Sequence, residues 1–365
     1  MVNSPSVAAI EAGKALQERI PVTVLTGYLG AGKTTLLNRI LSEDHGRRYA
    51  VIVNEFGEIG IDNDLIVNTD EELFEMNNGC ICCTVRGDLI RTLHGLLARG
   101  GNFDAIIVET TGLADPGPVV QTFFVDHFLE ARTVLDSVTT VVDAKHILLR
   151  LADSREAAEQ IAFADQIVLN KTELVDEDQL RAIESRLKKI NSLAAVHRAQ
   201  RANVDLAKVL GRSAFNIEHI VSLEPDFLTS GDAYVDAAHV HDEHCEHEHD
   251  HQHDSGIHSI SLFSAHPMDG ARVSNWLNAL VASKGADILR AKGIIDVMGE
   301  NRRLVFQAVH MLLEGDYQRA WKAQETRCSR LVFIGRNLEE AALRTGFRSC
   351  VAVESAHSEG KQWST

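Results

Sequence analysis

A glycine-rich segment near the N-terminus restricts the fold of this chain more than any other feature. Residues 27–34 read GYLGAGKT and fit the pattern G-x-x-x-x-G-K-[ST], whose backbone N–H groups close around phosphate oxygens. A β-branched run, Pro21 to Thr26, precedes the segment, and a helical pattern, Lys33 to Ser42, follows it. A strand, this loop and a helix in that order predict an α/β fold with a phosphate-binding loop for a nucleotide.

Short apolar strands alternate with helical patterns over the first two-thirds of the chain. The further predicted strands are Ala50–Asn54, Ala105–Glu109, Val138–Asp143 and Gln166–Asn170, and the further predicted helices are Asp88–Arg99 and Glu177–Ile190. This alternation requires crossover connections, so it predicts a mostly parallel sheet. We assign residues 20–223 to one P-loop nucleotide-binding domain that follows an N-terminal extension, residues 1–19.

The alternating pattern is lost from about Glu224 to Ser255, where the chain becomes acidic and His-rich. We therefore predict a linker at residues 224–256, a smaller α+β domain at residues 257–354 and a disordered tail at residues 355–365. The predicted elements of the smaller domain are a helix, Gly270–Ser283, and strands at His258–Ser264, Gly293–Met298, Arg303–Leu313 and Arg330–Gly335. Alternation within these strands predicts a half-exposed antiparallel sheet.

Composition excludes several classes of partner. The chain carries 36 lysines and arginines against 52 acidic residues, a net charge of −16, which repels nucleic acid and attracts metal cations. No apolar run approaches the ~20 residues needed to cross a bilayer, and the acidic Glu11 and Glu18 are unlike a signal or transit peptide. We expect a cytoplasmic protein that binds neither nucleic acid nor membranes.

The expected nucleotide contacts begin in the glycine-rich loop. Lys33 is expected to reach the β- and γ-phosphates, and Thr34 to ligate Mg²⁺. The helix N-terminus adds partial positive charge. The residues of this segment expected to bind the nucleotide are Gly27, Gly30, Ala31, Gly32, Lys33, Thr34 and Thr35.

A second carboxylate ends the apolar run that leads to Glu109-Thr110-Thr111-Gly112. Glu109 is expected to hold a Mg²⁺-bound water, with an ordinary strand-end acid as the alternative. The backbone N–H of Gly112 is expected to sense the γ-phosphate and so to report whether the nucleotide has been cleaved.

The base-reading segment is Asn170-Lys171-Thr172-Glu173, which is similar to the N-K-x-D guanine reader of GTPases but carries Glu173 in place of Asp. A carboxylate accepts hydrogen bonds from guanine N1–H and N2–H₂, which adenine does not offer, so GTP is the expected nucleotide. The extra methylene of Glu173 leaves the strength of the guanine preference open.

Three of the six cysteines, Cys80, Cys82 and Cys83, lie within four residues. Three thiolates leave one tetrahedral position of a zinc ion open, as transfer of the metal requires. Which two or three of them bind one ion together stays open, because Cys82 and Cys83 are adjacent. A reactive or redox cysteine pair is the functional alternative. Cys328 and Cys350 are expected to be small residues packed in or near a core.

These segments together resemble the CobW-type GTPases, whose zinc-related members are called zinc-regulated GTPase metalloprotein activators. The resemblance runs from about Val22 into the C-terminal region, and it includes NEFGEIGID at residues 54–62, GCICC at 79–83 and ETTGLADP at 109–116. It implies a GTPase domain followed by a CobW C-terminal domain. It further implies metal bound by the C-x-C-C motif and delivered to a client metalloprotein in a step that consumes GTP, with Glu55 helping to hold Mg²⁺ or water.

The thiols lie in sequence between the switch-like segment around Glu55 and Glu109, so loss of the γ-phosphate could move them. We hypothesise that GTP favours a metal-holding state and GDP a metal-releasing one. Seven histidines in an acidic stretch are expected to gather metal ions weakly. They are His239, His241, His244, His247, His249, His251 and His253.

Several alternatives remain open on the sequence. Cobalt accepts the same ligands as zinc, so a cobalt chaperone for cobalamin synthesis is one. A zinc buffer or sensor without delivery is another, and a small-molecule kinase that uses the same phosphate loop is a third. The client protein, and whether the chain forms a homodimer, are also left open.

Overall fold

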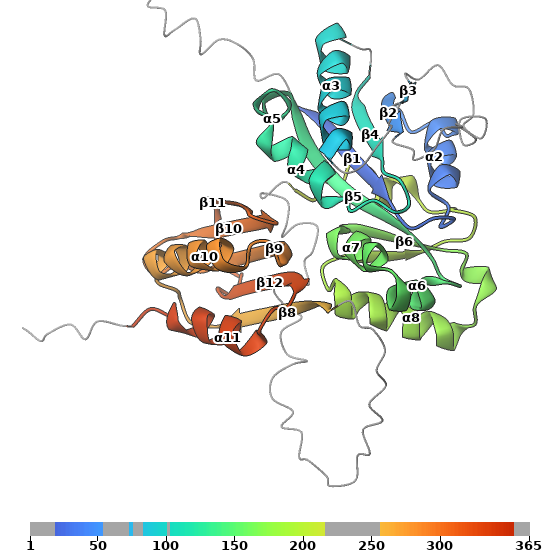
Figure 1. Ribbon diagram of the computed structural model, residues 1–365. Coiled ribbons are helices and arrows are strands. Elements are labelled where there is room, and N and C mark those ends of the chain that lie inside the picture. The colour runs from blue at the N-terminus through green and yellow to red at the C-terminus, as the bar shows by residue number, and fades with distance from the viewer. Residues whose placement is uncertain (1–18, 54–72, 76–82, 101–102, 216–255, 354–365) are drawn as a thin grey trace, which may run out of the picture. The chain divides into compact units, whose positions relative to one another are not determined.

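The computed structural model of the protein describes residues 19–53, 73–75, 83–100, 103–215 and 256–353 (Figure 1). These residues belong to two compact units, the first formed by residues 19–215 and 256–258 and the second by residues 259–353. The domain limits predicted at 224 and 257 lie in or next to the segment 216–255, which is outside the described residues, and they stay predictions.

The first unit contains a seven-stranded sheet in the order β3-β2-β4-β1-β5-β6-β7. Every neighbouring pair in this sheet is parallel. The strands are β1 (Ile20–Thr26), β2 (Tyr49–Val53), β3 (Leu73–Glu75), β4 (Ala105–Glu109), β5 (Thr133–Asp143), β6 (Gln166–Asn170) and β7 (Ala195–Arg198). The predicted parallel α/β fold is confirmed.

Helices cover the strands of this sheet, so the central strands are buried along their length. The helices are α2 (Lys33–Ser42), α3 (Cys83–Arg99), α4 (Gly117–Val125), α5 (His127–Arg132), α6 (Ile147–Asp153), α7 (Arg155–Phe163) and α8 (Glu177–Ile190), with 3-10 turns η2 (Thr172–Leu174) and η3 (Leu206–Lys208). Helix α2 buries Leu36, Leu37 and Ile40 in one core with Val51 and Ile107 of the sheet. Helices α3, α4 and α5 contact one another, and α7 contacts β5 and α8.

Element boundaries follow local chemistry where a cap is present. Helix α8 begins at the predicted Glu177 because the Asp176 side chain accepts from Gln179 N, while the Gln179 side chain accepts from Asp176 N. Helix α3 begins at Cys83, five residues before the predicted Asp88. The predicted start was too late, because Val85 lies four residues before Leu89 and continues the apolar spacing into the first turns.

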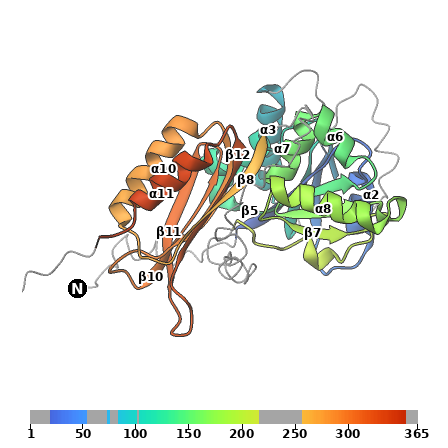
Figure 2. The same cartoon turned by 90° about the horizontal axis from the view of Figure 1, so that it is seen from below.

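The second unit is an α+β fold, as predicted. Its five strands lie in the order β11-β10-β9-β12-β8, and β9 runs antiparallel to β10 and β12. Figure 2 shows helices α10 and α11 side by side on one face of this sheet. The elements are β8 (Ile257–Ser264), α10 (Gly270–Lys284), β9 (Ile288–Ile295), β10 (Arg302–Val309), β11 (Leu312–Ala320), β12 (Ser329–Arg336) and α11 (Glu340–Ser349).

Two expectations for this sheet are wrong. The predicted strand Arg303–Leu313 is two antiparallel strands, β10 and β11, which meet at His310 with a left-handed φ of 50°. The sheet is also not half-exposed throughout, since all eight residues of β9 and seven of eight in β12 are buried. Strand β9 is central in the sheet, whereas the edge strand β11 has no buried residue. None of the described helices is long and apolar enough to span a membrane.

Candidate nucleotide site

The phosphate loop joins the carboxyl end of β1 to the first turn of α2. Gly27 adopts a φ of 142°, and a Cβ at this position would lie 2.2 Å from the carbonyl oxygen of Val141. Gly32 adopts a φ of 109°, and a Cβ there would lie 2.5 Å from Nδ2 of Asn170. Both positions require glycine because the loop packs directly on β5 and on the side chain that ends β6.

The N–H groups of the first turn of α2 lie at the end of the phosphate loop. Gly32 is the N-cap, and no side chain among the described residues caps this helix. The N–H groups of this turn and the helix dipole are therefore suited to an anion. Lys33 Nζ donates a 2.9 Å hydrogen bond to the carbonyl oxygen of Gly27, so its ammonium lies across the loop. Thr34 is half-buried and Thr35 is exposed.

Strand β4 ends beside the phosphate loop because it pairs with β1. Glu109 lies opposite Leu25 in this pairing and is 6% exposed. The next residue, Thr110, donates its backbone N–H to the Leu25 carbonyl at 2.9 Å and its hydroxyl to Oγ1 of Thr26 at 2.8 Å. The carboxylate predicted to act on Mg²⁺ thus lies at the strand end next to the strand that enters the phosphate loop.

The turn after β4 packs on the phosphate loop itself. The N–H of Ala114 donates to the carbonyl of Thr111 at 3.1 Å and closes the turn. A Cβ on Gly112 would lie 2.7 Å from the backbone nitrogen of Leu29. The backbone of Gly112 therefore touches the loop, which suits a residue expected to respond to the γ-phosphate.

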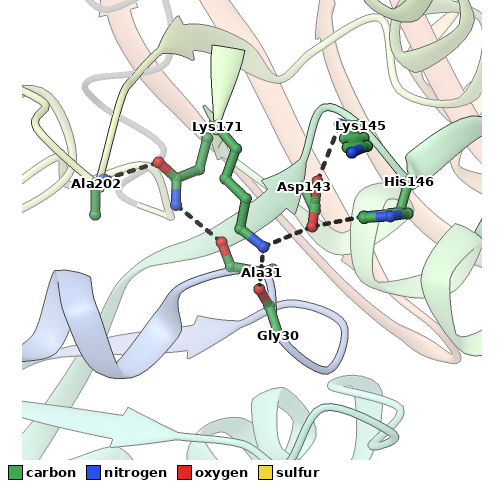
Figure 3. Close-up of polar contacts among 8 residues, drawn as sticks. Gly30, Ala31, Asp143, Lys145, His146, Lys171 and Ala202 are labelled. Carbon is green, nitrogen blue, oxygen red and sulfur yellow. Dashed lines mark hydrogen bonds and ion pairs between the residues drawn. The ribbon is translucent and has the colours of Figure 1, made fainter. Parts of the chain in front are cut away.

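The base-reading segment is tied to the same loop. Asn170 is 2% exposed, and its Nδ2 donates to the carbonyl of Ala31 at 2.9 Å. Lys171 has a left-handed φ of 62°, and its Nζ donates to the carbonyl of Gly30 at 2.7 Å (Figure 3). Glu173 lies in η2 with its side chain exposed. The structure thus brings Asn170 and Lys171 against the phosphate loop.

Asp143 is a site residue that the sequence analysis did not single out. Figure 3 shows its carboxylate between Lys171, Lys145 and His146. Its Oδ2 accepts from Lys171 Nζ at 2.7 Å and lies 3.0 Å from Nδ1 of His146, while Oδ1 accepts from Lys145 N at 2.9 Å. Burial alone would raise the pKa of Asp143, but the hydrogen bonds from Lys171 and His146 outweigh it and lower the pKa below its ordinary value. Like Glu109, Asp143 is an acid at the end of a buried parallel strand, and that signal could have found it.

The loop after β7 is a second part that the sequence analysis missed. The backbone N–H of Ala202 donates to Oδ1 of Asn170 at 2.7 Å, so one amide side chain joins this loop to the phosphate loop. A hollow of about 540 Å³ lies between this loop and the segment after β6, with Thr172, Ala199 and Asn203 in its lining. A backbone donor such as Ala202 N–H has no side-chain signature, so sequence alone did not indicate it.

The chain is similar to known proteins over most of its length. The family model described as "CobW/HypB/UreG, nucleotide-binding domain" matches residues 21–198, and the one described as "Cobalamin synthesis protein cobW C-terminal domain" matches residues 257–351. A relative from Escherichia coli (strain K12), named zinc chaperone YjiA, is 38% identical over 333 residues, which are 90% of this chain and 98% of that protein. The chain belongs to the CobW family of P-loop GTPases.

Other relatives and a solved structure agree with this assignment to the CobW family. The zinc chaperone CobW of a Sinorhizobium species is 34% identical, with 93% of this chain and 99% of that protein covered. The zinc-regulated GTPase metalloprotein activator 1 of Schizosaccharomyces pombe is 34% identical, with 87% and 83% covered. The crystal structure of Zn(II)-bound YjiA GTPase from E. coli superposes with a TM-score of 0.72 at 33% identity, covering 92% of this chain and all of that one.

The predicted metal ligands of this CobW-family chain fall largely outside the described residues. Cys80, Cys82 and Glu55 lie there, as do the seven histidines from His239 to His253. Cys83 is the first residue of α3. Within the described part of the chain, no group of three or more His, Cys, Asp or Glu side chains is arranged to hold a metal ion.

The two C-terminal cysteines agree with the core packing predicted for them. Cys328 and Cys350 are free thiols, 3% and 0% exposed, and Cys350 packs in the core of the second unit. Burial raises the pKa of both thiols, which disfavours the thiolate that metal binding and redox chemistry require.

Proposed function

We propose that this CobW-family protein is a GTP-dependent metallochaperone that binds zinc through Cys80, Cys82 and Cys83 and transfers it to a client metalloprotein when GTP is hydrolysed. The observation that carries the proposal is the contact of the Gly112 backbone with the phosphate loop. Gly112 lies in the turn after β4, β4 follows α3 in the chain, and α3 is the helix that the thiol segment enters. The turn that touches the phosphate loop is therefore linked through the chain to the thiols. The relatives named zinc chaperones, which match nearly the whole chain, support zinc as the cargo.

The nucleotide site fits GTP and Mg²⁺. The left-handed glycines, the uncapped α2 N-terminus and Lys33 offer donors to phosphate oxygens. Thr34 and Glu109 supply oxygens of the kind that Mg²⁺ prefers. Bound Mg²⁺ would neutralise charge on the phosphates as the bond to the γ-phosphate breaks. Glu173, exposed beside Lys171, would accept the guanine N–H groups.

The position of the thiols suggests how hydrolysis releases metal. The segment that holds them runs from β3 to α3 in sequence, and α3 leads to β4 with Glu109. Strand β2 pairs with β3, which precedes the thiol segment, and with β4, which follows α3. Loss of the γ-phosphate removes its contact with the turn after β4, and the pairing through β2 would carry the effect from β4 to the thiol segment. Moving a two-state site from mostly closed to mostly open needs ~5.5 kcal/mol of differential binding.

The histidine stretch would act as a weak collector. Imidazoles bind zinc, cobalt and nickel, and seven of them within residues 239–253 raise the local metal concentration without a fixed site. In this proposal they deliver metal to the thiols and are not required for nucleotide coupling.

Zinc affinity in two nucleotide states tests the proposal. We would measure it by chelator competition on full-length protein in which the seven tract histidines are changed to asparagine, with Mg²⁺ plus a non-hydrolysable GTP analogue or with GDP. We expect zinc to bind at least ~10-fold more tightly with the analogue, about 1.4 kcal/mol of coupling. Cys82→Ala should abolish the difference, while the matched Cys328→Ala control, a buried thiol in the second unit, should leave it intact.

The same measurement separates the alternatives. Equal zinc affinity in both nucleotide states would contradict nucleotide-gated release and favour a metal buffer or sensor. Tighter and better coupled binding of cobalt, measured in parallel, would favour cobalt as the cargo. Delivery to a client requires a further measurement, the GTP-dependent appearance of zinc in an apo metalloprotein added to the loaded chaperone.

A further inference from the structure

A buried amide on α7 holds the turn after β4. Gln160 is 1% exposed, and its Nε2 donates to the carbonyl of Gly112 at 3.1 Å and to the carbonyl of Ala114 at 3.1 Å. The hydroxyl of Thr140 on β5 donates to the backbone carbonyl of Gln160 at 2.8 Å. One side chain therefore joins α7, itself anchored on β5, to both ends of the tripeptide Gly112–Ala114.

The opposite side of the same turn rests on the phosphate loop. A Cβ on Gly112 would lie 2.6 Å from Cδ2 and 2.7 Å from the backbone nitrogen of Leu29. After the turn, Oδ1 of Asp115 accepts from Gly117 N at 2.8 Å, where α4 begins. The turn is thus clamped between the phosphate loop and Gln160, with little freedom to move away from the loop.

The polar character of Gln160 calls for a role beyond packing. The other buried residues of α7 are apolar except Glu159, which pairs with Arg155 at 2.7 Å. A buried amide costs free energy unless it is hydrogen-bonded, and here both bonds go to backbone carbonyls of the turn. These two bonds fix the position of the turn relative to α7, which an apolar side chain of the same size would not do.

We propose that Gln160 is a positioning residue that holds the Gly112 turn against the phosphate loop, so that the Gly112 N–H meets the γ-phosphate of GTP without reordering. This inference rests on the proposed role of Gly112 in sensing the γ-phosphate. Because GDP has no γ-phosphate, release of the clamp weakens GTP binding and leaves GDP binding unchanged. Gln160 itself does not touch the nucleotide.

Nucleotide titrations on the full-length protein test this selectivity. Gln160→Met keeps the size of the side chain and removes both donors. We expect its affinity for a non-hydrolysable GTP analogue with Mg²⁺ to fall about 10-fold, with GDP affinity within ~2-fold of wild type. The matched control is Gln166→Met, because Gln166 is also a buried glutamine of this unit, 7% exposed, but is bonded to His197 at 2.7 Å. It should leave both affinities unchanged.

The outcomes separate the inference from the function it rests on. Equal losses for both nucleotides, no loss, or tighter GTP-analogue binding in Gln160→Met would overturn the positioning role. Failure of the wild-type protein to bind the GTP analogue would instead overturn the proposed function. If Gln160→Met does not fold, amide hydrogen exchange of the wild-type Ala114 N–H, which closes the turn on the Thr111 carbonyl, decides with GDP bound: slow exchange supports the clamp, and exchange at loop rates refutes it.

Discussion

Lys171 and Asp143 form a 2.7 Å ion pair that joins the base-reading segment after β6 to the carboxyl end of β5. The same ammonium donates to the carbonyl of Gly30 in the phosphate loop. One lysine therefore connects three segments of the nucleotide site, and its left-handed backbone, with a φ of 62°, turns the side chain back over the loop.

Replacement of Asp143 by asparagine should weaken nucleotide binding without selectivity. Asp143→Asn removes the negative charge that holds the Lys171 ammonium. Lys171 belongs to the base-reading segment and contacts the phosphate loop, and GTP and GDP share the base and the α- and β-phosphates. We therefore expect both affinities to fall by a similar factor of about 3–10. Fluorescent-nucleotide titration measures this. The control Asp178→Asn removes the exposed partner of Arg181 on α8 and should change neither affinity. Wild-type affinity of Asp143→Asn for both nucleotides would contradict a role for Asp143 in positioning Lys171.

The pH dependence of the Asp143 contribution follows from its lowered pKa. Burial opposes ionisation, but the hydrogen bonds from Lys171 and His146 lower the pKa below the ordinary 3.8. A depressed folded-state pKa means that the stabilisation is present above the unfolded pKa and is lost as pH falls through the folded one. The stability of wild type relative to Asp143→Asn should therefore persist from pH 8 to about 5 and shrink only below about 4. Thermal unfolding of both proteins across this range tests the sign.

Gly27 should not tolerate a side chain. A Cβ would lie 2.2 Å from the carbonyl of Val141, and a φ of 142° is unfavourable for alanine. Gly27→Ala should lower the free energy of unfolding by at least about 2 kcal/mol and abolish nucleotide binding. The control Gly95→Ala, in α3 with open space around its Cβ, should be neutral or stabilising by up to about 1 kcal/mol. Denaturant unfolding compares the two, and wild-type behaviour of Gly27→Ala would show that the loop adapts.

Sequence patterns predicted the parts of the site that are local in the chain. The phosphate loop, the strand ending at Glu109 and the segment at Asn170 each carry a motif next to a buried strand, so the strand ends could be placed at one edge of a parallel sheet. Asp143 carries the same strand-end signal, but its pairing with Lys171 depends on β5 lying next to β6, which is a property of strand order. Sequence periodicity does not specify strand order.

The sequence patterns also failed to predict two short or irregular elements. Strand β7 has four residues and no buried position, so it shows neither an apolar run nor a strong alternation. The hairpin between β10 and β11 turns at His310 and Met311 without glycine, proline or asparagine, which removed the usual turn signal. In both cases pairing with a neighbouring strand, and not the local conformational preference of the sequence, determines the structure.

Removal of one partner from a buried ion pair should strongly destabilise the second unit. The side chain of Arg303 is 1% exposed and pairs with Glu325 at 3.0 Å, and Arg319 pairs with the same carboxylate at 2.9 Å. Burial would raise the pKa of Glu325, but hydrogen bonds from Arg319 and Lys322 N and the charge of Arg303 outweigh it and lower the pKa. Glu325→Gln leaves a buried charge unpaired and should cost about 3–5 kcal/mol.

Tryptophan fluorescence reports the unfolding of this unit. The three tryptophans of the chain, Trp276, Trp321 and Trp363, all lie after residue 258. The control Glu340→Gln removes an exposed i,i+4 partner of Arg344 and should change stability by less than about 1 kcal/mol. Equal effects of Glu325→Gln and Glu340→Gln on the fluorescence transition would contradict a special role for the buried pair.

The exposed carboxylate of Glu173 should decide base preference. Glu173→Asn replaces an acceptor of the guanine N1–H and N2–H₂ groups with an amide, which can donate to the 2-oxo group of xanthine instead. We expect GTP affinity to fall at least ~10-fold and XTP affinity to exceed it, with stability unchanged because the residue is exposed in η2. Glu173→Asp, with the side chain usual in N-K-x-D, is the matched variant and should bind GTP at least as tightly as wild type. Competition titration with GTP, XTP and ATP measures all three preferences; unchanged GTP affinity in Glu173→Asn would mean that the extra methylene places the carboxylate out of reach of the base.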